Sequence, residues 1–173
     1  MSLWVVIAAA IALIAATLAA AFAFLGPERI WSLYGPADLG PVSFETLQRR
    51  KKPNDALAAP ADLTRARIDV YPPVFAVDAA ALRRALGRAI ASERRLTLVA
   101  IDDAVPAERY VQRSERMRFP DTIIVRFLDR PGGRSTLAIY SRSQLGGNDL
   151  GVNLARINRW LDKLAKEVPP VAE

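Results

Sequence analysis

Hydroxyl, amide and carboxylate side chains gather in one glycine-rich stretch near the C-terminal end of the sequence. This stretch follows a predicted strand and precedes a predicted helix, which Asn148 or Asp149 is placed to cap. Backbone N–H groups at a helix N-terminus, with neighbouring donors, can hold an anion or a small polar ligand. The candidate ligand-binding residues are Ser141, Arg142, Ser143, Gly146, Asp149, Asn153 and Arg156. The same residues also suit a plain turn, in which Gly supplies backbone freedom and Asp or Asn supplies the cap, and the sequence favours this plainer interpretation.

Two further clusters of charge could do chemistry. A basic run, made of Arg49, Arg50, Lys51 and Lys52, could contact anionic lipid headgroups, although such a run is more often a solvated face. Asp102 and Asp103 form an acidic pair that could act as acid and base or bind a hard cation. Because adjacent residues of a strand point to opposite faces, we expect these two carboxylates not to converge.

Two missing residue types argue against most enzyme chemistry. The sequence contains no Cys and no His, which removes thiolate nucleophiles, the commonest zinc ligands and Ser-His-Asp catalysis. The glycine-rich stretch also lacks the G-K-[ST] of a phosphate-binding loop. We therefore expect no catalytic residue, no metal and no cofactor. A hydrolase or transferase that uses Asp102, Asp103 or Asp149 is the least favoured hypothesis.

Periodic apolar residues indicate the elements that position these groups. Apolar residues alternate over 122–129, and the turn 130–133 joins them to the next strand as a hairpin. Over 150–167 they recur every three or four residues, which predicts a helix with one apolar stripe and with Arg156 on its outer surface. We predict strands at about 96–102, 109–116, 122–129 and 135–142, a helix at 78–92 that Asp78 is placed to cap, and a helix at 150–167. The expected fold class is α+β: an N-terminal transmembrane helix followed by an antiparallel β-sheet with two packed helices.

Residues 2–25 form an uncharged apolar run. At about 1.5 Å per residue, a helix of this length spans about 36 Å, enough to cross a hydrocarbon core of about 30 Å. Trp4 near one end, and Trp31 and Tyr34 beyond the other, are placed to lie at the headgroup level and to contact lipid or a partner. The alternative is that Trp31 and Tyr34 pack on the soluble domain. We predict a single-pass anchor. The alternative is a cleaved signal peptide, which the lack of a charged residue before the run disfavours.

The chain divides into four segments by composition. We predict a transmembrane anchor at 1–25, a Pro-rich linker at 26–63, an α+β soluble domain at 64–168 and a tail at 169–173. Every charged residue follows the anchor, so the formal net charge of +6 belongs to the soluble part of this basic protein. The expected partners are therefore the lipid bilayer and its anionic headgroups. No nucleic-acid-reading motif occurs, so we expect no nucleic acid as a partner.

A spaced series of Ser, Gly, Asp, Asn and Arg runs through 141–157, and the segments 52–57 and 119–121 carry Pro-Asn and Phe-Pro-Asp. This series resembles the end of the domain-of-unknown-function 1499 family, R-S-x-S-R-x-G-x-x-D-x-G-x-N-x-x-R-[IV]. The matching residues are Ser141, Ser143, Gly146, Asp149, Gly151, Asn153, Arg156 and Ile157. Tyr140 and Gln144 stand where many relatives carry Arg, and Asp55 stands where some carry Cys, so an anion site of that family would be incomplete here.

The resemblance implies a fold and little chemistry, because the family's activity is unassigned. Its relatives are often membrane-anchored or exported, which implies the inner (cytoplasmic) membrane with the soluble domain in the periplasm. The flanking charges, Arg29 beside Glu28, determine the orientation poorly, and the positive-inside rule leans toward the cytoplasm.

The alanine-rich anchor and the Pro-rich linker favour one functional hypothesis. We expect a non-catalytic accessory or assembly subunit of a membrane protein complex, acting by protein–protein interaction with other membrane subunits. An energy-transducing complex, photosynthetic or respiratory, is the kind that the family's distribution suggests. The alternative is a binding module for lipid or a small anionic ligand.

Overall fold

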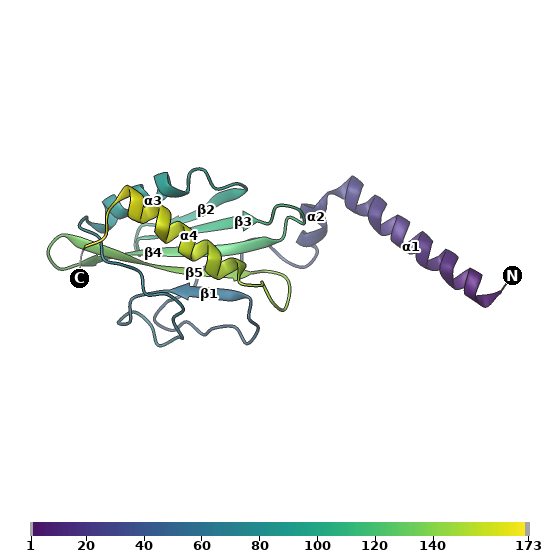
Figure 1. Cartoon of the computed structure of the whole chain (residues 1–173), viewed down its shortest axis with the longest axis horizontal. Coiled ribbons are helices and arrows are strands. Elements are labelled where there is room, and N and C mark those ends of the chain that lie inside the picture. The colour runs from purple at the N-terminus through teal and green to yellow at the C-terminus, as the bar shows by residue number, and fades with distance from the viewer. Residues whose placement is uncertain (1, 172–173) are drawn as a thin grey trace.

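Five antiparallel strands lie at the centre of the fold in the computed structural model, which describes residues 2–171 (Figure 1). Along the sheet the strand order is β1-β5-β4-β3-β2. The elements are α1 (Leu3–Leu25), α2 (Pro27–Ser32), β1 (Asp55–Ala58), α3 (Ala79–Ile90), β2 (Leu96–Asp102), β3 (Ala107–Arg113), β4 (Pro120–Arg130), β5 (Arg134–Ser143) and α4 (Val152–Glu167). The predicted α+β class is confirmed, with its N-terminal helix, antiparallel sheet and two packed helices. The last two residues of the predicted tail, 172 and 173, lie outside the described residues.

The hairpin of β4 and β5 is the longest pairing in the sheet. Its register runs from Asp121 opposite Ser143 to Arg130 opposite Arg134. The chain reverses through Gly132 at φ 80° and Gly133 at φ 68°, conformations that glycine adopts without strain. Because side chains alternate between the two faces of a strand, this register places every second residue of both strands beneath the helices.

Helices α3 and α4 both cover one face of the sheet (Figure 1). As predicted, Asp78 caps α3, accepting a hydrogen bond from the backbone N–H of Ala81 at 2.6 Å. Trp160 of α4 is fully buried and meets Tyr110 of β3 edge-on, with ring centroids 5.7 Å apart. The core on this face joins apolar residues of both helices to residues of the sheet; its large members include Phe75, Leu82, Leu86, Tyr110, Ile123, Phe127, Leu137, Ile139, Ile157, Trp160 and Leu164.

Residues 37–48, the covering segment, lie across the opposite face of the sheet. Phe44 is 1% exposed and packs with Ile124 and Tyr140, and Val42 and Leu47 pack around this group. The chain then enters β1, which pairs with β5. Much of the segment for which we predict a linker therefore belongs to the folded unit, because its few apolar residues supply the second layer that this face of the sheet requires.

Helix α1 is long and apolar enough to cross a membrane, with a mean hydropathy of 2.7 and no buried residue. Gly26, at φ 75°, separates it from the short helix α2. Helix α2 packs on the domain: Glu28 lies 3.5 Å from Arg113, and the ring of Trp31 lies 4.7 Å from that of Phe119. The anchor candidate is thus joined to the sheet domain through α2.

The sheet has two distinct ends. One, the α2 end, brings together α2, the loop 114–119, the loop 144–151 and the basic run 49–52. At the opposite end lie the β2–β3 turn, the β4–β5 turn and the start of α3, where Ala79 donates to Asp129 at 2.9 Å. The glycine-rich stretch and the basic run, far apart in sequence, therefore meet at the α2 end.

Candidate functional site

The guanidinium group of Arg156 lies buried between α4 and the sheet. It donates from Nε to Gln112 Oε1 and from Nη2 to Asp121 Oδ2, each at 2.6 Å. Its Nη1 donates to Ser141 Oγ at 2.8 Å and to Asn153 Oδ1 at 2.6 Å. Arg156 is only 4% exposed, so its prediction on the outer surface of the helix is wrong. The reason is that α4 turns a polar patch toward the sheet, where Asp121 neutralises the charge.

Asn153 extends this cluster into the turn before α4. Its amide nitrogen donates to Asp149 Oδ2 at 2.7 Å and to Ser143 Oγ at 3.0 Å. Asp149 also accepts from the backbone N–H groups of Asn153, at 2.9 Å, and Gly151, at 3.0 Å. The helix begins after Gly151, in a left-handed conformation, rather than after Asn148 or Asp149 as expected. Asp149, two residues before Gly151, nevertheless accepts hydrogen bonds from N–H groups at the start of the helix, as a capping residue does.

Asn54 ties the segment before β1 to the same cluster. Its amide donates to the carbonyl of Gly146 at 2.9 Å, and its own carbonyl accepts from the backbone N–H of Ser143 at 3.0 Å. Asn54, Gln112 and Asp121 were not among the predicted site residues. Asn54 and Asp121 lie in the two upstream segments that match the family pattern, but nothing in the sequence marks Gln112, which is brought there only by the register of β3 with β4.

The buried cluster is closed on itself. Ser141, Ser143, Asn153 and Arg156 each find hydrogen-bond partners within the described residues, and none of their buried polar atoms is orphaned there. A fully connected network of this kind specifies the packing of a helix on a sheet. Five of the predicted ligand-binding residues therefore hold one another, with Asp149 at the solvent side, and Gly146 contributes its carbonyl to the same turn.

Arg142 lies on the opposite face of β5 from the serines that flank it. Its Nη2 donates to the carbonyls of Leu39 and Gly40 at 2.8 and 2.7 Å, while its Nε has no partner among the described residues. Burial lowers the pKa of Arg142. The guanidinium group also lies 5.8 Å from the centre of the Tyr140 ring. Arg142 therefore fastens the covering segment and does not join the cluster around Arg156.

The four basic residues of the run 49–52 divide into two inner and two outer ones. Arg49 pairs with Asp55 at 2.9 Å and with Asp69 at 2.8 Å. Burial alone would raise the pKa of Asp55, but hydrogen bonds from Arg49 and from Tyr140 lower it below its usual range. The next residue, Arg50, donates to the carbonyl of Ser143.

Lys51 and Lys52 are exposed and make no ion pair within the described residues. They line a hollow of about 540 Å³ together with Asn148 and Asp149. The basic run and the glycine-rich turn therefore share one surface at the α2 end. Of the groups on that surface, the two ammonium groups are the ones left free to meet an external anion.

The predicted aromatic residues fall into two places. Trp31 lies in a cluster with Phe22, Tyr34 and Phe119, and its indole N–H donates to the carbonyl of Met117. Trp4, 78% exposed, lies at the far end of α1. Trp31 thus makes a contact within the chain.

The candidate acidic residues do not converge. Asp102 accepts hydrogen bonds within the β2–β3 turn, from the backbone N–H groups of Ala104 and Val105, and Asp103 pairs with Arg83 at 3.1 Å. Asp149 lies at the α2 end, away from both. Among the described residues, no group of three or more Asp or Glu could hold a metal ion.

Glu93 locks the C-terminal half of α4 to the loop before β2. Its carboxylate accepts from Lys163 at 2.6 Å, from Arg159 at 3.0 Å and from Gln112 at 3.1 Å. Burial alone would raise the pKa of Glu93, but the hydrogen bonds from Arg159, Lys163 and Gln112 outweigh it and lower the pKa to about 2. Gln112 links this group to Arg156, so both networks act on the same helix.

Comparison with known families identifies the region that contains most of these contacts. The family model described as "Protein of unknown function (DUF1499)" matches residues 44–164, which is more than half of the chain. The match includes the buried cluster, the basic run and all five strands. No curated protein and no solved structure matches the chain.

We expect Arg156→Met to lower the free energy of unfolding by about 3–5 kcal/mol, because it leaves the Asp121 carboxylate buried without its cation. Urea unfolding of the full chain in detergent, followed by near-ultraviolet circular dichroism, measures this loss. The control is Arg88→Met, which removes an exposed pair with Glu167 and should cost about 1 kcal/mol or less. Equal losses in the two variants would contradict the structural role of the cluster.

We also expect the wild-type chain to lose stability in acid through Glu93. The folded pKa of about 2 lies below the ordinary value of 4.5, so the stabilisation is complete above pH 4.5 and is lost as the pH falls toward 2. The loss from this group amounts to up to about 3 kcal/mol. Glu93→Gln should be less stable at neutral pH and should show a flatter dependence over that window in urea titrations. The exposed residue Glu167 provides the control, since Glu167→Gln should keep the wild-type slope.

Proposed function

We propose that this chain, which belongs to the family of proteins of unknown function DUF1499, is a non-catalytic accessory subunit of a membrane protein complex, anchored by α1. The observation that carries the proposal is the packing of α2 on the domain. A freely tethered domain needs only a flexible linker. Here the chain instead fixes the direction in which its helix leaves the sheet.

The contact between α2 and the domain has aromatic and ionic parts. The Trp31 ring lies 6.3 Å from Phe22 of α1 and 4.7 Å from Phe119 of the loop 114–119. On the other side of α2, Glu28 lies 3.5 Å from Arg113. With α1 in a bilayer, these contacts turn the α2 end of the sheet toward the headgroups. A subunit held in one orientation can present a constant surface to neighbours in the same membrane.

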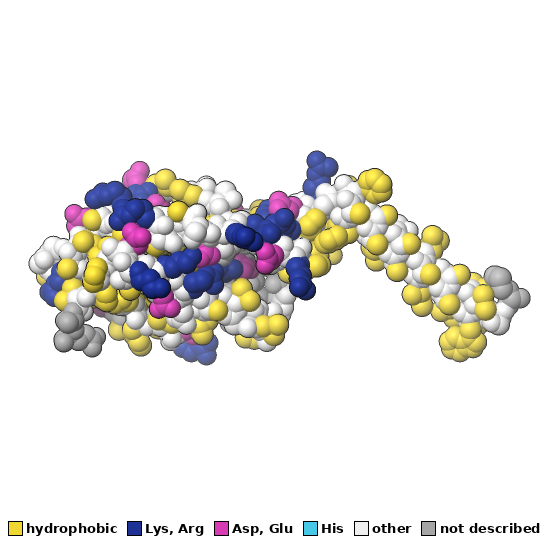
Figure 2. Space-filling model, turned by 45° about the horizontal axis from the view of Figure 1, so that its top comes forward, with side chains coloured by type: hydrophobic (Ala, Val, Ile, Leu, Met, Phe, Trp, Pro, Cys, Tyr) yellow, Lys and Arg dark blue, Asp and Glu magenta, His cyan; other side chains and the backbone are white. Residues whose placement is uncertain are grey.

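The composition of the α2 end suits that position. The segments 26–36, 49–54, 114–119 and 144–151 hold seven Lys or Arg and three Asp or Glu, which accounts for four of the six net positive charges. Exposed apolar residues lie among them, including Leu33, Tyr34, Met117 and Phe119. Figure 2 shows dark blue side chains near the junction with α1, and none along the helix itself. Basic and aromatic side chains together are typical of the membrane–water interface.

Helix α1 itself offers a surface to other helices. None of its residues is buried, and 10 of its 23 residues are small alanines, which allow close helix approach. Together with the fixed domain, this surface supports an accessory role in a membrane complex. That the complex is an energy-transducing one is suggested by the family resemblance alone. The periplasmic placement of the domain rests on the resemblance alone.

The accessory role predicts that the chain migrates with a larger complex. After mild detergent extraction from its own membrane, the wild-type chain should run in a large species on a native gel, with defined partner subunits. Trp31→Ala should lose most of this association, because it removes the centre of the contact that orients the domain. Tyr71→Ala, which removes an exposed aromatic ring of the sheet domain, should behave as wild type. A wild-type chain that migrates alone would refute the role.

A second candidate function, binding of anionic lipid headgroups, is favoured by the free ammonium groups of Lys51 and Lys52 at the α2 end. Each Lys held near an anionic surface contributes about 1 kcal/mol, and the contribution falls as salt is added. This candidate needs no protein partner.

In nanodiscs, we expect anionic lipid to slow hydrogen exchange in the loops 49–54 and 114–119 relative to zwitterionic lipid. Lys51→Glu with Lys52→Glu should weaken this protection by at least about 30-fold: loss of the two positive charges corresponds to about 2 kcal/mol, and repulsion of the two new carboxylates adds to it. The matched control changes two exposed Arg residues at the other end of the sheet, Arg84→Glu with Arg134→Glu, and should leave the protection intact. Equal protection in both lipids would remove the basis of the headgroup candidate.

A further inference from the structure

The two edges of the sheet differ in whether other parts of the chain cover them. The β1 edge is covered by the chain itself: Asp69 and Val70 donate their backbone N–H groups to the carbonyl of Leu57, and Leu57 donates to Asp69 in return. Strand β2 pairs with β3 on one side, and no described residue pairs with its other side. An edge of this kind presents a row of free backbone donors and acceptors.

Strand β2 also lacks most of the features that protect open edges. Its sequence, Leu-Thr-Leu-Val-Ala-Ile-Asp, contains no Lys and no Pro, and only its last residue is charged. Leu98, Val99 and Ile101 are 45%, 41% and 53% exposed. A register shift between Leu98 and Ala100 is the one irregularity of its pairing with β3. Proteins usually blunt such an edge with charge, so an apolar open edge indicates an interaction site.

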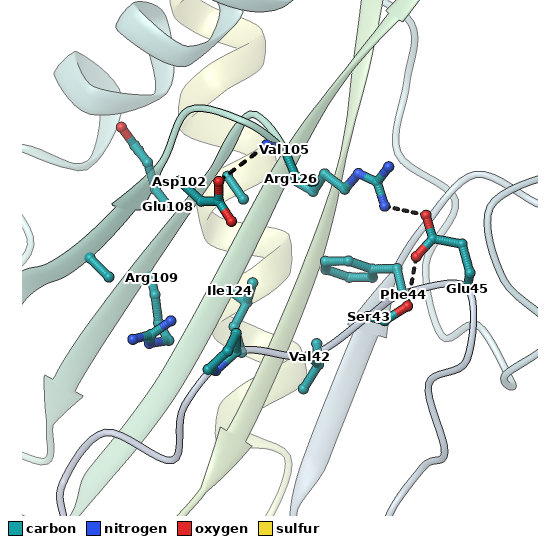
Figure 3. A pocket seen from close by; sticks show the side chains of 13 residues that line it. Val42, Ser43, Phe44, Glu45, Asp102, Val105, Glu108, Arg109, Ile124 and Arg126 are labelled. Atoms are coloured by element: carbon teal, nitrogen blue, oxygen red, sulfur yellow. Dashed lines mark hydrogen bonds and ion pairs between the residues drawn. The ribbon is translucent and has the colours of Figure 1, made fainter.

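A cavity opens beside this edge, on the face away from the helices. It has a volume of about 430 Å³, and its walls come from Ala100 of β2, Val105 and Ala107 of the next turn and strand, and Val42 and Phe44 of the covering segment. Figure 3 shows Val42, Phe44 and Ile124 around this space, with the pair of Arg126 and Glu45 at its rim. The covering segment stops short of β2, so its apolar layer ends at this cavity.

We propose that β2 is the docking edge for an extended segment of another protein, which adds to the sheet as a strand and places a side chain in the cavity beside Ala100. In strand addition, main-chain hydrogen bonds supply affinity and pockets for alternate side chains supply specificity. Both components occur here, in the free backbone groups of β2 and in the apolar cavity.

The charges that flank β2 define the chemistry of the partner segment. Arg94 and Arg95 precede the strand, and Asp102 and Asp103 end it; the side chains of Arg94 and Asp103 are 81% and 83% exposed. A segment that pairs antiparallel, the more stable pairing, meets Asp103 with its first residues and Arg94 with its last. The fitting partner is therefore an apolar strand with a basic residue at its N-terminal end and an acidic residue at its C-terminal end.

A second copy of this chain carries the same charge pattern, but its anchor excludes it in the same membrane. Strand β2 runs from the α2 end of the sheet to the opposite end, since Arg95 lies beside Arg113 at its start. Antiparallel pairing of two copies of β2 would send their α1 helices out of opposite ends of the joined sheet. Two such helices cannot enter one bilayer, so the occupant is another protein. This step rests on the proposed function, because it assumes that α1 spans the membrane.

The test uses the full chain in detergent micelles and a synthetic probe, acetyl-Lys-Thr-Val-Thr-Val-Thr-Val-Glu-amide. We expect the probe to slow hydrogen exchange of the backbone amides at 96–102, and the same peptide with Lys and Glu exchanged to bind about 3–10-fold more weakly. Leu98→Lys, on the edge, and Ala100→Trp, which fills the cavity, should each weaken binding by about 10-fold or more, as measured by the probe concentration that half-protects 96–102. Val152→Lys, at an exposed apolar residue of α4, is the control and should bind as wild type.

Three results would overturn the proposal. The first is the absence of protection at 96–102 at about millimolar probe, the weak end of measurable affinity. The second is equal binding by Leu98→Lys and the wild type. The third is measured with the chain in liposomes: protection of 96–102 that rises with the density of protein in the membrane, without probe, would mean that a second copy in the same membrane pairs with β2. Binding that Ala100→Trp leaves unchanged would overturn the role of the cavity. Because the binding assay needs no native partner, failure here is distinguishable from loss of the native complex in membrane extracts.

Discussion

Placing the Arg156 guanidinium group beneath α4 imposes conditions on several distant segments at once. A buried charge requires an opposite charge, which Asp121 supplies from β4 at 2.6 Å. The remaining donors require acceptors, and Gln112 and Ser141 supply them from the two neighbouring strands. The register of β3, β4 and β5 is therefore coupled to the position of one helix. A slip of one residue in any of these strands would turn its acceptor to the opposite face.

The regular elements could be predicted from the sequence, but the polar side of α4 could not. Alternating apolar residues located β4 and β5 within two residues, and Asp78 located the start of α3, because those signals are local. The periodic stripe on α4 did not reveal that its buried face also includes Asn153, Arg156 and Trp160. A charged residue normally lies outside such a stripe. Arg156 lies inside because Asp121 and Gln112 face it from the sheet. These partners are 35 and 44 residues away along the chain, on strands whose pairing no local pattern reports.

The Pro-rich stretch shows a second limit of local reasoning. Five prolines between residues 26 and 63 predict irregular chain, and most of that chain is irregular. Irregular chain can still be part of the core when a sheet has two apolar faces and only one layer of helices. Phe44 fills that need on the second face, and β1 completes the sheet. Whether a segment links or covers thus depends on what the sheet leaves exposed, which composition does not report.

The covering segment leads from α2 to the part of the sheet that carries the cavity. It starts at α2 and crosses the sheet, with Asp38 binding Arg109 at 2.8 Å and Leu39 donating to Thr122 at 2.9 Å. Its apolar side chains pack against β1, β4 and β5, so the layer that begins after α2 covers the part of the sheet nearest β1. Beside β2, the face away from the helices has no such layer, and among the described residues no strand pairs with the outer edge of β2. The uncovered face and the unpaired edge therefore coincide, and one extended segment could satisfy both.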